Sequence, residues 1–189
     1  MTPYFKVSFI LFLFYAPFLF LIFIPSKTIL HSNDFLYDVC QPLKAYHIKP
    51  LEQLFCQKEQ TIAIIKPDGY AYSKDIKSIL IENGFHILES KVNTLNPTII
   101  EEWYHDKLNQ SYFPSLQRYL TSGPIETLLL ERIDAIHGLR RLIGPTDPEK
   151  ARKLYPSSIR ARYGTNIQEN AIHASDSVQA VLNEKKLLL

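Results

Sequence analysis

The sequence predicts an α+β fold in which a four-stranded antiparallel sheet carries helices on one face. Two observations over residues 59–189 predict this fold. Apolar residues recur with strand and helix periods in the order β-α-β-α-α-β-α-loop-β-α, and glycine or proline separates most of these stretches. The skeleton of this order, β-α-β followed by a second β-α-β, is that of a ferredoxin-like α/β sandwich.

The first half of this region predicts two strands and three helices. Residues 61–66 are rich in β-branched side chains and end at Pro67-Asp68-Gly69, as expected of a strand followed by a turn. Residues 74–83 carry apolar side chains at helical spacing, and Gly84 follows them as a helix stop. Loose alternation predicts a strand over residues 85–95, and helical spacing predicts helices over residues 97–108 and 112–120.

The second half predicts two short strands and two helices around an irregular stretch. Ser122-Gly123-Pro124 breaks the chain before a strand over residues 125–130, and a helix follows over residues 135–143. Residues 144–163 contain Pro145, Pro148 and Pro156, so we expect them to be irregular. A short apolar strand over residues 170–174 precedes a last helix over residues 177–186, with Asp176 as its N-cap.

The first 27 residues differ from the rest of the chain. Residues 7–24 form an uncharged, mainly apolar run with six phenylalanines, flanked by Lys6 and Lys27. At about 1.5 Å per helical residue, this run is barely long enough to cross a bilayer. We expect a hydrophobic helix that acts as a signal anchor or single membrane span; the alternative is an artefact of the gene model. The protein would then be membrane-anchored in the first case, and cytoplasmic or mitochondrial in the second.

Composition and charge narrow the classes of function. Residues 28–58 show no sustained period and are expected to be a linker before the domain at residues 59–189. Two cysteines, Cys40 and Cys56, are too few for a disulfide framework or a zinc site; we expect free thiols, with a single bridge as the alternative in an oxidising compartment. The net charge of +2 argues against specific nucleic-acid binding. Seven basic residues against two acids from Arg140 to Arg162 suggest a site for a small anion, or else a solvated surface.

One histidine stands in an informative context. His173 follows the last predicted strand and precedes the last helix, within Asn170-Ala171-Ile172-His173-Ala174-Ser175-Asp176-Ser177. This segment closely resembles the active-site signature of nucleoside diphosphate kinases. Three further blocks resemble that family in the same order, so the resemblance extends over residues 59–189: Ile65-Lys66-Pro67-Asp68-Gly69, Ser122-Gly123-Pro124 and Gly144-Pro145-Thr146-Asp147-Pro148.

The resemblance implies a reaction as well as the ferredoxin-like fold. The γ-phosphate of a nucleoside triphosphate such as ATP would pass to a nucleoside diphosphate by a ping-pong mechanism through phosphorylated His173. Phosphoryl transfer needs a neutral nucleophile and positive charge around the phosphate oxygens. Arg140 and Arg160 match the two phosphate-contacting arginines of the family, and their charge also favours the neutral imidazole. Glu184 matches the glutamate that orients the histidine.

Further site residues follow from the same resemblance. Tyr104 and Ser175 match positions that line the site and orient its groups. Leu116 and Ile167 either complete an apolar slot for the base or belong to the core. We expect no metal site made by the protein, since Mg²⁺ would arrive on the nucleotide phosphates. The remaining nucleotide contacts are Lys66 for sugar and phosphates, Asn170 for the ribose, Thr146 for the phosphates and Tyr112 for the base.

Some features depart from the hexameric members of the family. Ala174 replaces the glycine after the histidine, which costs about 1 kcal/mol if the backbone there needs a positive φ. A longer stretch between Pro148 and Pro156, with residues 134–136 and 159–164, resembles the divergent group II branch, nearest to nucleoside diphosphate kinase 6. The sequence ends at Leu189 without the C-terminal extension of the hexamers. We therefore carry over neither the hexamer nor its turnover rate, although a homo-oligomer is compatible with the sequence.

An active nucleoside diphosphate kinase is the leading function that the sequence predicts. The alternative is a catalytically weak nucleotide-binding module that acts through a protein partner. A third hypothesis is a phospho-donor to proteins or a nuclease-like side activity. The enzyme is favoured because every matched contact position keeps a compatible side chain.

Overall fold

The computed structural model describes Cys40 and residues 56–189. Contacts divide the chain into two units, Met1–Gln57 and Lys58–Leu189, and the fold below is that of the second unit. The hydrophobic helix predicted over residues 7–24 lies outside the described residues, as does most of the predicted linker. Among the residues described, no helix is both long enough and apolar enough to span a bilayer.

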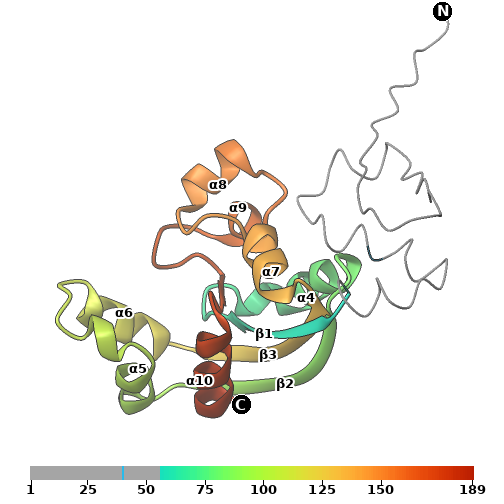
Figure 1. The fold of residues 1–189 in the computed structure, drawn as a ribbon. Coiled ribbons are helices and arrows are strands. Elements are labelled where there is room, and N and C mark those ends of the chain that lie inside the picture. Colours follow the sequence, from blue (N-terminus) through green and yellow to red (C-terminus); the bar gives the residue numbers. More distant parts are fainter. Residues whose placement is uncertain (1–39, 41–55) are drawn as a thin grey trace, which may run out of the picture. The chain divides into compact units, whose positions relative to one another are not determined.

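Four antiparallel strands form a single sheet in the order β2-β3-β1-β4 (Figure 1). β1 (Lys58–Ile65) lies between β3 (Pro124–Ile133) and β4 (Ile172–Ala174), and β2 (His86–Thr94) is the far edge. His173 pairs with Ile64 across the β1–β4 ladder. The predicted four-stranded antiparallel sheet is therefore confirmed, and its register places the histidine beside the end of β1.

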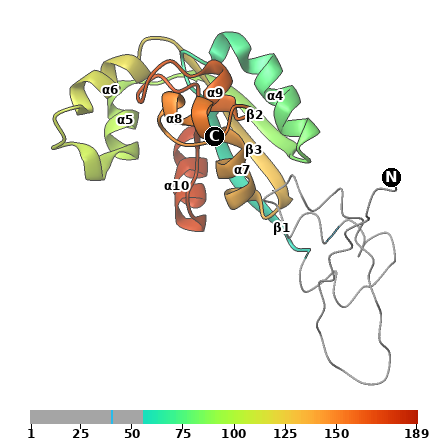
Figure 2. The same ribbon diagram turned by 90° about the horizontal axis from the view of Figure 1, so that it is seen from above.

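Helices cover both faces of this sheet, whereas the sequence predicted helices on one face. Ile62 and Ile64 of β1 pack in one core with residues of α5, α6 and α10, while Ala63 and Ile65 pack in a second core with residues of α4, α7 and α9. Figures 1 and 2 show α4 and α10 on opposite sides of the sheet. The helices are α4 (Ser73–Glu82), α5 (Pro97–Trp103), α6 (Phe113–Leu120), α7 (Ala135–Ile143), α9 (Ile159–Tyr163) and α10 (Val178–Leu188).

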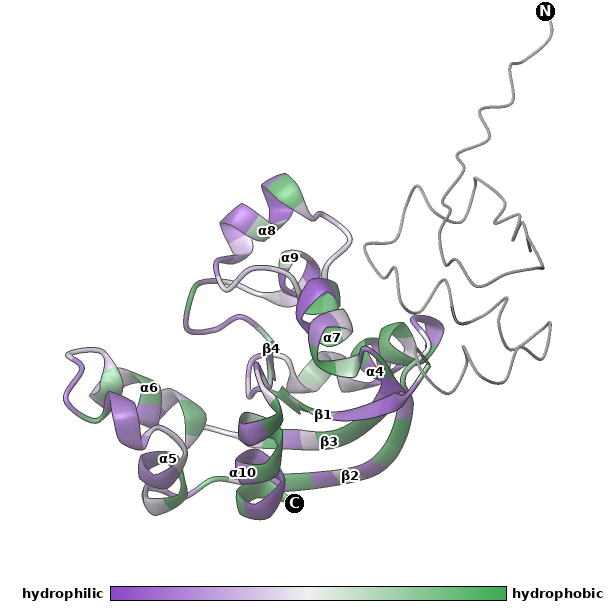
Figure 3. Ribbon diagram, viewed as in Figure 1, coloured by the Kyte–Doolittle hydropathy of each residue, from purple (hydrophilic) through white to green (hydrophobic). Residues whose placement is uncertain are grey.

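The pattern of β1 explains why the one-face prediction was wrong. Every residue from Thr61 to Ile65 is buried, so β1 does not alternate between apolar and polar positions. A strand that is covered by helices on both faces is expected to be a continuous apolar run, and the sequence of β1 shows such a run. By contrast, α10 has one buried face, with Val181, Glu184 and Leu188, and Figure 3 shows hydrophobic and hydrophilic residues alternating along it.

Two further elements differ from the prediction. Residues 144–163 are not wholly irregular, because they include α8 (Pro148–Leu154) as well as α9. Pro148 occupies the first turn of α8, where a missing N–H breaks no helical hydrogen bond, and Asp147 caps the helix by accepting a hydrogen bond from the Glu149 amide. The last helix is capped by Ser177, which accepts from the Ala180 amide, and not by Asp176.

The helix predicted over residues 135–143 is present with those bounds, and the other predicted elements are present with shifted ends. The helix predicted over residues 97–108 stops at Trp103, and the 3-10 turn η2 (His105–Lys107) follows it. A further 3-10 turn, η1 (Tyr70–Tyr72), leads from the turn after β1 into α4. These short turns carry no strong hydrophobic period, so the sequence did not separate them from the neighbouring helices.

The expectation of two free thiols was wrong. Cys40 and Cys56 form a disulfide, with their Cα atoms 5.5 Å apart. The alternative of a single bridge is therefore the one that the structure supports. Spacing along the chain could not decide this point, since a bridge depends on the distance between the two cysteines in space.

Thiol labelling tests this bridge. In denaturant without a reductant, an alkylating reagent is expected to modify neither Cys40 nor Cys56, because both sulfurs are already bonded. After reduction, mass spectrometry should find both residues alkylated. Two alkylated cysteines before reduction, in protein purified under oxidising conditions, would contradict the bridge.

Candidate active site

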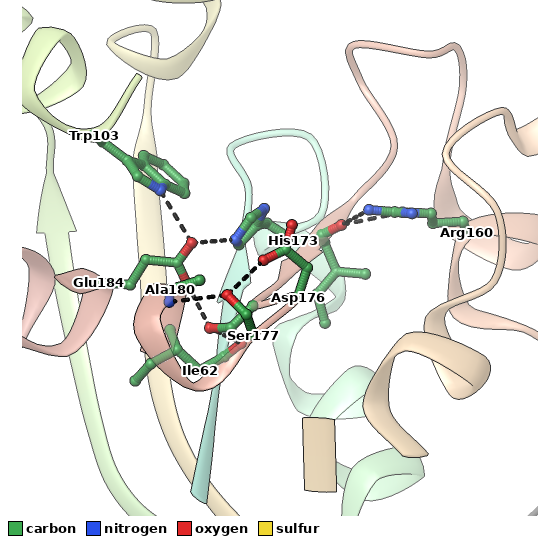
Figure 4. Close-up of polar contacts among 10 residues, drawn as sticks. Ile62, Trp103, Arg160, His173, Asp176, Ser177, Ala180 and Glu184 are labelled. Carbon is green, nitrogen blue, oxygen red and sulfur yellow. Dashed lines mark hydrogen bonds and ion pairs between the residues drawn. The ribbon is translucent and has the colours of Figure 1, made fainter. Parts of the chain in front are cut away.

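His173 lies on β4 between a carboxylate on one side and a guanidinium on the other (Figure 4). Its side chain is 25% exposed, so the ring is held by the protein but open to solvent. The Nε2 atom lies 2.7 Å from Oε1 of Glu184, which projects from the buried face of α10. The two residues that the family resemblance pairs are therefore in contact.

Three donors converge on the buried carboxylate of Glu184. His173 and the indole Nε1 of Trp103, 3.2 Å away, contact Oε1, while the Ser175 hydroxyl donates to Oε2 at 2.5 Å. Burial alone would raise the pKa of Glu184, but the hydrogen bonds from His173, Ser175 and Trp103 bring this pKa below its ordinary value. Glu184 is therefore ionised at neutral pH.

The ionised carboxylate determines the tautomer of the histidine. A carboxylate can only accept hydrogen bonds, so the Nε2 atom of His173 must carry the proton in their shared contact. In the neutral ring, Nδ1 then keeps its lone pair. The arrangement thus presents Nδ1 as a nucleophile, with the carboxylate placed to balance positive charge on the ring.

The opposite side of the site is strongly positive. Arg160 donates from Nε and Nη2 to the carbonyl of Ile172 at 3.2 and 3.0 Å, and from Nη1 to that of Gly144 at 3.0 Å. A guanidinium has five N–H groups, so two remain for a ligand. Burial and the nearby charge of Arg140, which is exposed on α7, lower the pKa of Arg160 to about 10.

A third cation, Lys66, belongs to the same cluster. Burial and the charge of Arg160 lower the pKa of Lys66 to about 8, against the opposing effect of Asp68. A cation that lowers the pKa of its neighbour acts through a positive potential, which a bound anion would relieve. Lys66, Arg140 and Arg160 thus form the kind of site that binds a polyphosphate.

Asn170 joins this cluster to two loops. Its Oδ1 accepts from Lys66 Nζ at 2.8 Å, and its amide nitrogen donates to the carbonyls of Thr146 and Ile167 at 2.9 and 2.8 Å. Both amide N–H groups are therefore used within the protein, while the oxygen keeps one acceptor position for a sugar hydroxyl. The contact of Asn170 with the ribose stays a prediction. So does the contact of Thr146, which is exposed on the adjoining loop, with the phosphates.

The backbone near the histidine is unusual at Ala171 and not at Ala174. Ala171 has a φ of 67°, in the left-handed region that costs a non-glycine residue about 1–2 kcal/mol, whereas Ala174 is not among the residues with positive φ. The strain energy that a positive φ would cost at Ala174 therefore does not arise. The Ala171 amide donates to Asp68 Oδ2 at 2.9 Å, and its carbonyl accepts from the Lys66 amide at 2.9 Å, so both peptide groups are held.

Two tyrosines lie in the segment between α5 and α6, Tyr104 as the C-cap of α5 and Tyr112 as the N-cap of α6. Burial and the charge of Glu184 raise the pKa of Tyr104, which therefore keeps its phenolic proton at neutral pH. Tyr112 is 47% exposed, as a ring that stacks on a base must be. Leu116 belongs to the core, but Ile167 is 65% exposed and does not. The alternative that these two residues belong to the core is thus right for Leu116 and wrong for Ile167.

Sequence reasoning missed two residues that hold the site together. Asp68 lies within a recognised block but received no role, although it accepts hydrogen bonds from the Ala171 amide and from the Tyr119 hydroxyl. Trp103 received no role either, and its contact with Glu184 depends on the packing of α5 beside α10. The only available signal for Trp103 was that it is the single tryptophan of the chain and precedes Tyr104.

The described residues offer no protein cage for a metal ion. Among Cys40 and residues 56–189, no group of three or more His, Cys, Asp or Glu side chains could hold one. The side chains grouped around Arg160 are cationic, which suits polyphosphate better than a bare divalent cation.

Comparison with known proteins supplies close relatives. A sequence model described as "Nucleoside diphosphate kinase" matches residues 59–189. The chain is similar to "Probable nucleoside diphosphate kinase 5" of Arabidopsis thaliana, with 42% identity over 125 residues, or 65% of this chain and 87% of that protein. It is also similar to "Nucleoside diphosphate kinase homolog 5" of Homo sapiens, with 34% identity over 139 residues, or 74% of this chain and 65% of that protein.

A solved structure shares the fold. The crystal structure of the Aquifex aeolicus nucleoside diphosphate kinase, in an orthorhombic C222 form, superposes with a TM-score of 0.68 at 38% sequence identity. The similarity covers 70% of this chain and 96% of that one. The narrower resemblance to nucleoside diphosphate kinase 6 stays a prediction.

Gly69→Ala tests how closely the turn after β1 approaches the histidine strand. A Cβ at Gly69 would lie 2.4 Å from the carbonyl oxygen of Ala171, a backbone atom that cannot simply move aside. We expect a loss of about 1–3 kcal/mol in the free energy of unfolding, measured by urea denaturation. Gly123→Ala is the matched control, because its Cβ would meet only Pro67 Cβ, at 3.5 Å. Equal stability of the two variants would contradict this prediction.

The lowered pKa of Glu184 predicts how the stability of the protein depends on pH. A carboxyl group whose pKa is lower in the folded state than in the unfolded state stabilises the fold. This stabilisation is complete above the unfolded pKa of about 4.3, and it is lost as the pH falls through the folded pKa. Glu184→Gln should therefore cost about 1–3 kcal/mol at pH 7 and progressively less below pH 4.3. Urea denaturation across this range measures the difference, with exposed Glu89→Gln as the control. A difference independent of pH would refute the assignment.

Proposed function

The chain belongs to the nucleoside diphosphate kinase family, and we propose that it transfers the γ-phosphate of ATP or another nucleoside triphosphate to a nucleoside diphosphate through phosphorylated His173. The observation that carries this proposal is the position of His173 between Glu184 and Arg160 (Figure 4). One neighbour fixes the tautomer, and the other brings positive charge toward the bare nitrogen.

In the first half-reaction, Nδ1 of His173 attacks the γ-phosphorus of the triphosphate. The bond to the β–γ bridging oxygen breaks, and the nucleoside diphosphate leaves. The phosphorylated ring keeps its proton on Nε2, and the Glu184 carboxylate, 2.7 Å away, balances the positive charge that the ring gains. Lys66, Arg140 and Arg160 offset the charge of the transferring phosphoryl group and of the leaving diphosphate.

In the second half-reaction, a terminal phosphate oxygen of a different nucleoside diphosphate attacks the phosphorus on His173. The P–N bond breaks, and the imidazole returns to its starting tautomer because the proton stays on Nε2 throughout, where it is donated in a hydrogen bond to Glu184. The same positive groups serve both directions, as a ping-pong reaction between chemically similar nucleotides requires.

Nucleotide binding rests on groups that do not distinguish one base from another. Tyr112 would stack on the base, a contact worth about 1–3 kcal/mol that any base can make. The Asn170 oxygen and Lys66 would contact the sugar, and Thr146 the phosphates. Mg²⁺ would enter with the nucleotide phosphates and keep most of its water ligands.

A phosphoenzyme assay tests this function. Full-length protein incubated with γ-³²P-labelled ATP is expected to gain acid-labile label, and unlabelled GDP should then remove it as labelled GTP. His173→Ala should gain no label, since it lacks the nucleophile. His86→Ala is the matched control, because His86 is exposed at the start of β2, and it should label like the unmodified protein.

The alternative function predicts a different result in this assay. A nucleotide-binding module that acts through a protein partner would bind ATP but gain no label, or would keep its label after the GDP chase. Label on the His173→Ala variant would remove this residue from the mechanism.

Membrane attachment through residues 7–24 and assembly into a homo-oligomer also remain proposals. Fractionation of cells that express the chain with and without residues 1–27 would test the first. Light scattering of the purified protein would test the second.

A further inference from the structure

Trp103 occupies a position in the site that none of the family motifs accounts for. It is the last residue of α5, and its indole Nε1 donates to Oε1 of Glu184 at 3.2 Å. Its ring also packs perpendicular to that of His173, with 5.1 Å between ring centroids and 87° between planes. Trp103 therefore touches both members of the His173–Glu184 pair from a separate helix (Figure 4).

We propose that Trp103 is a positioning residue for phosphoryl transfer, which holds Glu184 and the His173 ring in the orientation that directs Nδ1 at the γ-phosphate. This inference rests on the proposed function, because it concerns the rate at which His173 becomes phosphorylated.

The carboxylate of Glu184 has two oxygens, and the protein holds each from a different direction. Ser175 donates to Oε2, and Trp103 donates to Oε1, the same oxygen that receives the His173 proton. With both oxygens held, the carboxylate cannot rotate about its terminal bond, so the histidine meets an acceptor in a fixed place. Without the indole N–H, Oε1 would be held only by His173, the residue that the carboxylate has to orient, and the Ser175 contact on Oε2 would be the one anchor from outside the pair.

The perpendicular ring contact limits the histidine itself. A half-turn of the His173 ring about its Cβ–Cγ bond would exchange Nδ1 with Cδ2 and Nε2 with Cε1, so the Nε2–Glu184 hydrogen bond would be lost and Nδ1 would no longer point at the phosphate. An aromatic ring packed at 87° against the imidazole takes up space that the ring needs during such a turn. Trp103 thus acts on both partners: by a hydrogen bond on Glu184 and by packing on His173.

A purely structural role for Trp103 makes a different prediction. Trp103 also packs against the core that contains Ile100 and Leu116, so its removal must cost some stability. If packing were its only role, any variant with the same loss of stability would phosphorylate at the same rate. The two roles can be separated when the rate of phosphorylation and the affinity for nucleotide are measured independently.

The test compares full-length protein with Trp103→Phe, which keeps an aromatic ring but lacks the N–H donor. Rapid-quench measurement at saturating ATP gives the rate of phosphoenzyme formation, and calorimetry with a non-hydrolysable ATP analogue gives the affinity. We expect Trp103→Phe to form the phosphoenzyme about tenfold more slowly, the effect of one hydrogen bond to a charged group, with affinity changed less than about twofold. Ile100→Val is the matched control, since it weakens the same core from the same helix and should keep the normal rate.

A second variant covers the case in which phenylalanine disturbs the fold. Replacement of Trp103 by β-(3-benzothienyl)alanine keeps the shape of the indole and exchanges only the N–H for sulfur, and it should slow the reaction similarly. If either folded variant forms the phosphoenzyme as fast as Ile100→Val, the positioning role is wrong. If the unmodified protein forms no phosphoenzyme, the proposed function fails and this inference fails with it, which is a distinguishable result.

Discussion

The carboxylate of Glu184 is the constraint on which the rest of the site depends. A buried carboxylate is costly unless several donors satisfy it, and here the donors come from β4, from the residue after β4 and from the end of α5. They can meet only when the sheet, α10 and α5 have all packed together. The arrangement around His173 is thus assembled by the tertiary fold, and the same contacts that stabilise the fold select the histidine tautomer.

The cations opposite Glu184 are held in place by the protein although their charges repel one another. Lys66 and Arg160 are anchored by backbone carbonyls and by Asn170, so their positions do not depend on a bound ligand. Burial and neighbouring charge nevertheless lower the pKa of both residues, since Arg160 repels Lys66 and Arg140 repels Arg160. Such repulsion costs stability and is relieved by a polyphosphate, which is the usual compromise between stability and function in an anion-binding site.

Sequence reasoning predicted the parts of this protein that local patterns encode. The strand periods predicted the antiparallel sheet, and the motif around His173 with Glu184 on the last helix predicted the central pair. It missed features that depend on contacts between distant segments: the covering of both sheet faces by helices, the Cys40–Cys56 bridge and the contacts of Trp103 and Asp68. The glycine that the family has at position 174 raised the question of a positive φ there, but the residue near the histidine with a positive φ is Ala171, and its alanine side chain gives no sign of this in the sequence.

The central claim is that Glu184 holds the proton on Nε2 of His173 and leaves Nδ1 bare. A long-range ¹H–¹⁵N correlation spectrum of protein labelled with ¹⁵N in its histidine rings measures this directly, with the His173 signals identified by their loss in His173→Ala. The account predicts that the proton of the neutral ring is on Nε2, and that phosphorus is attached to Nδ1 after reaction with ATP. A proton on Nδ1 with a bare Nε2, or phosphate attached to Nε2, would contradict it.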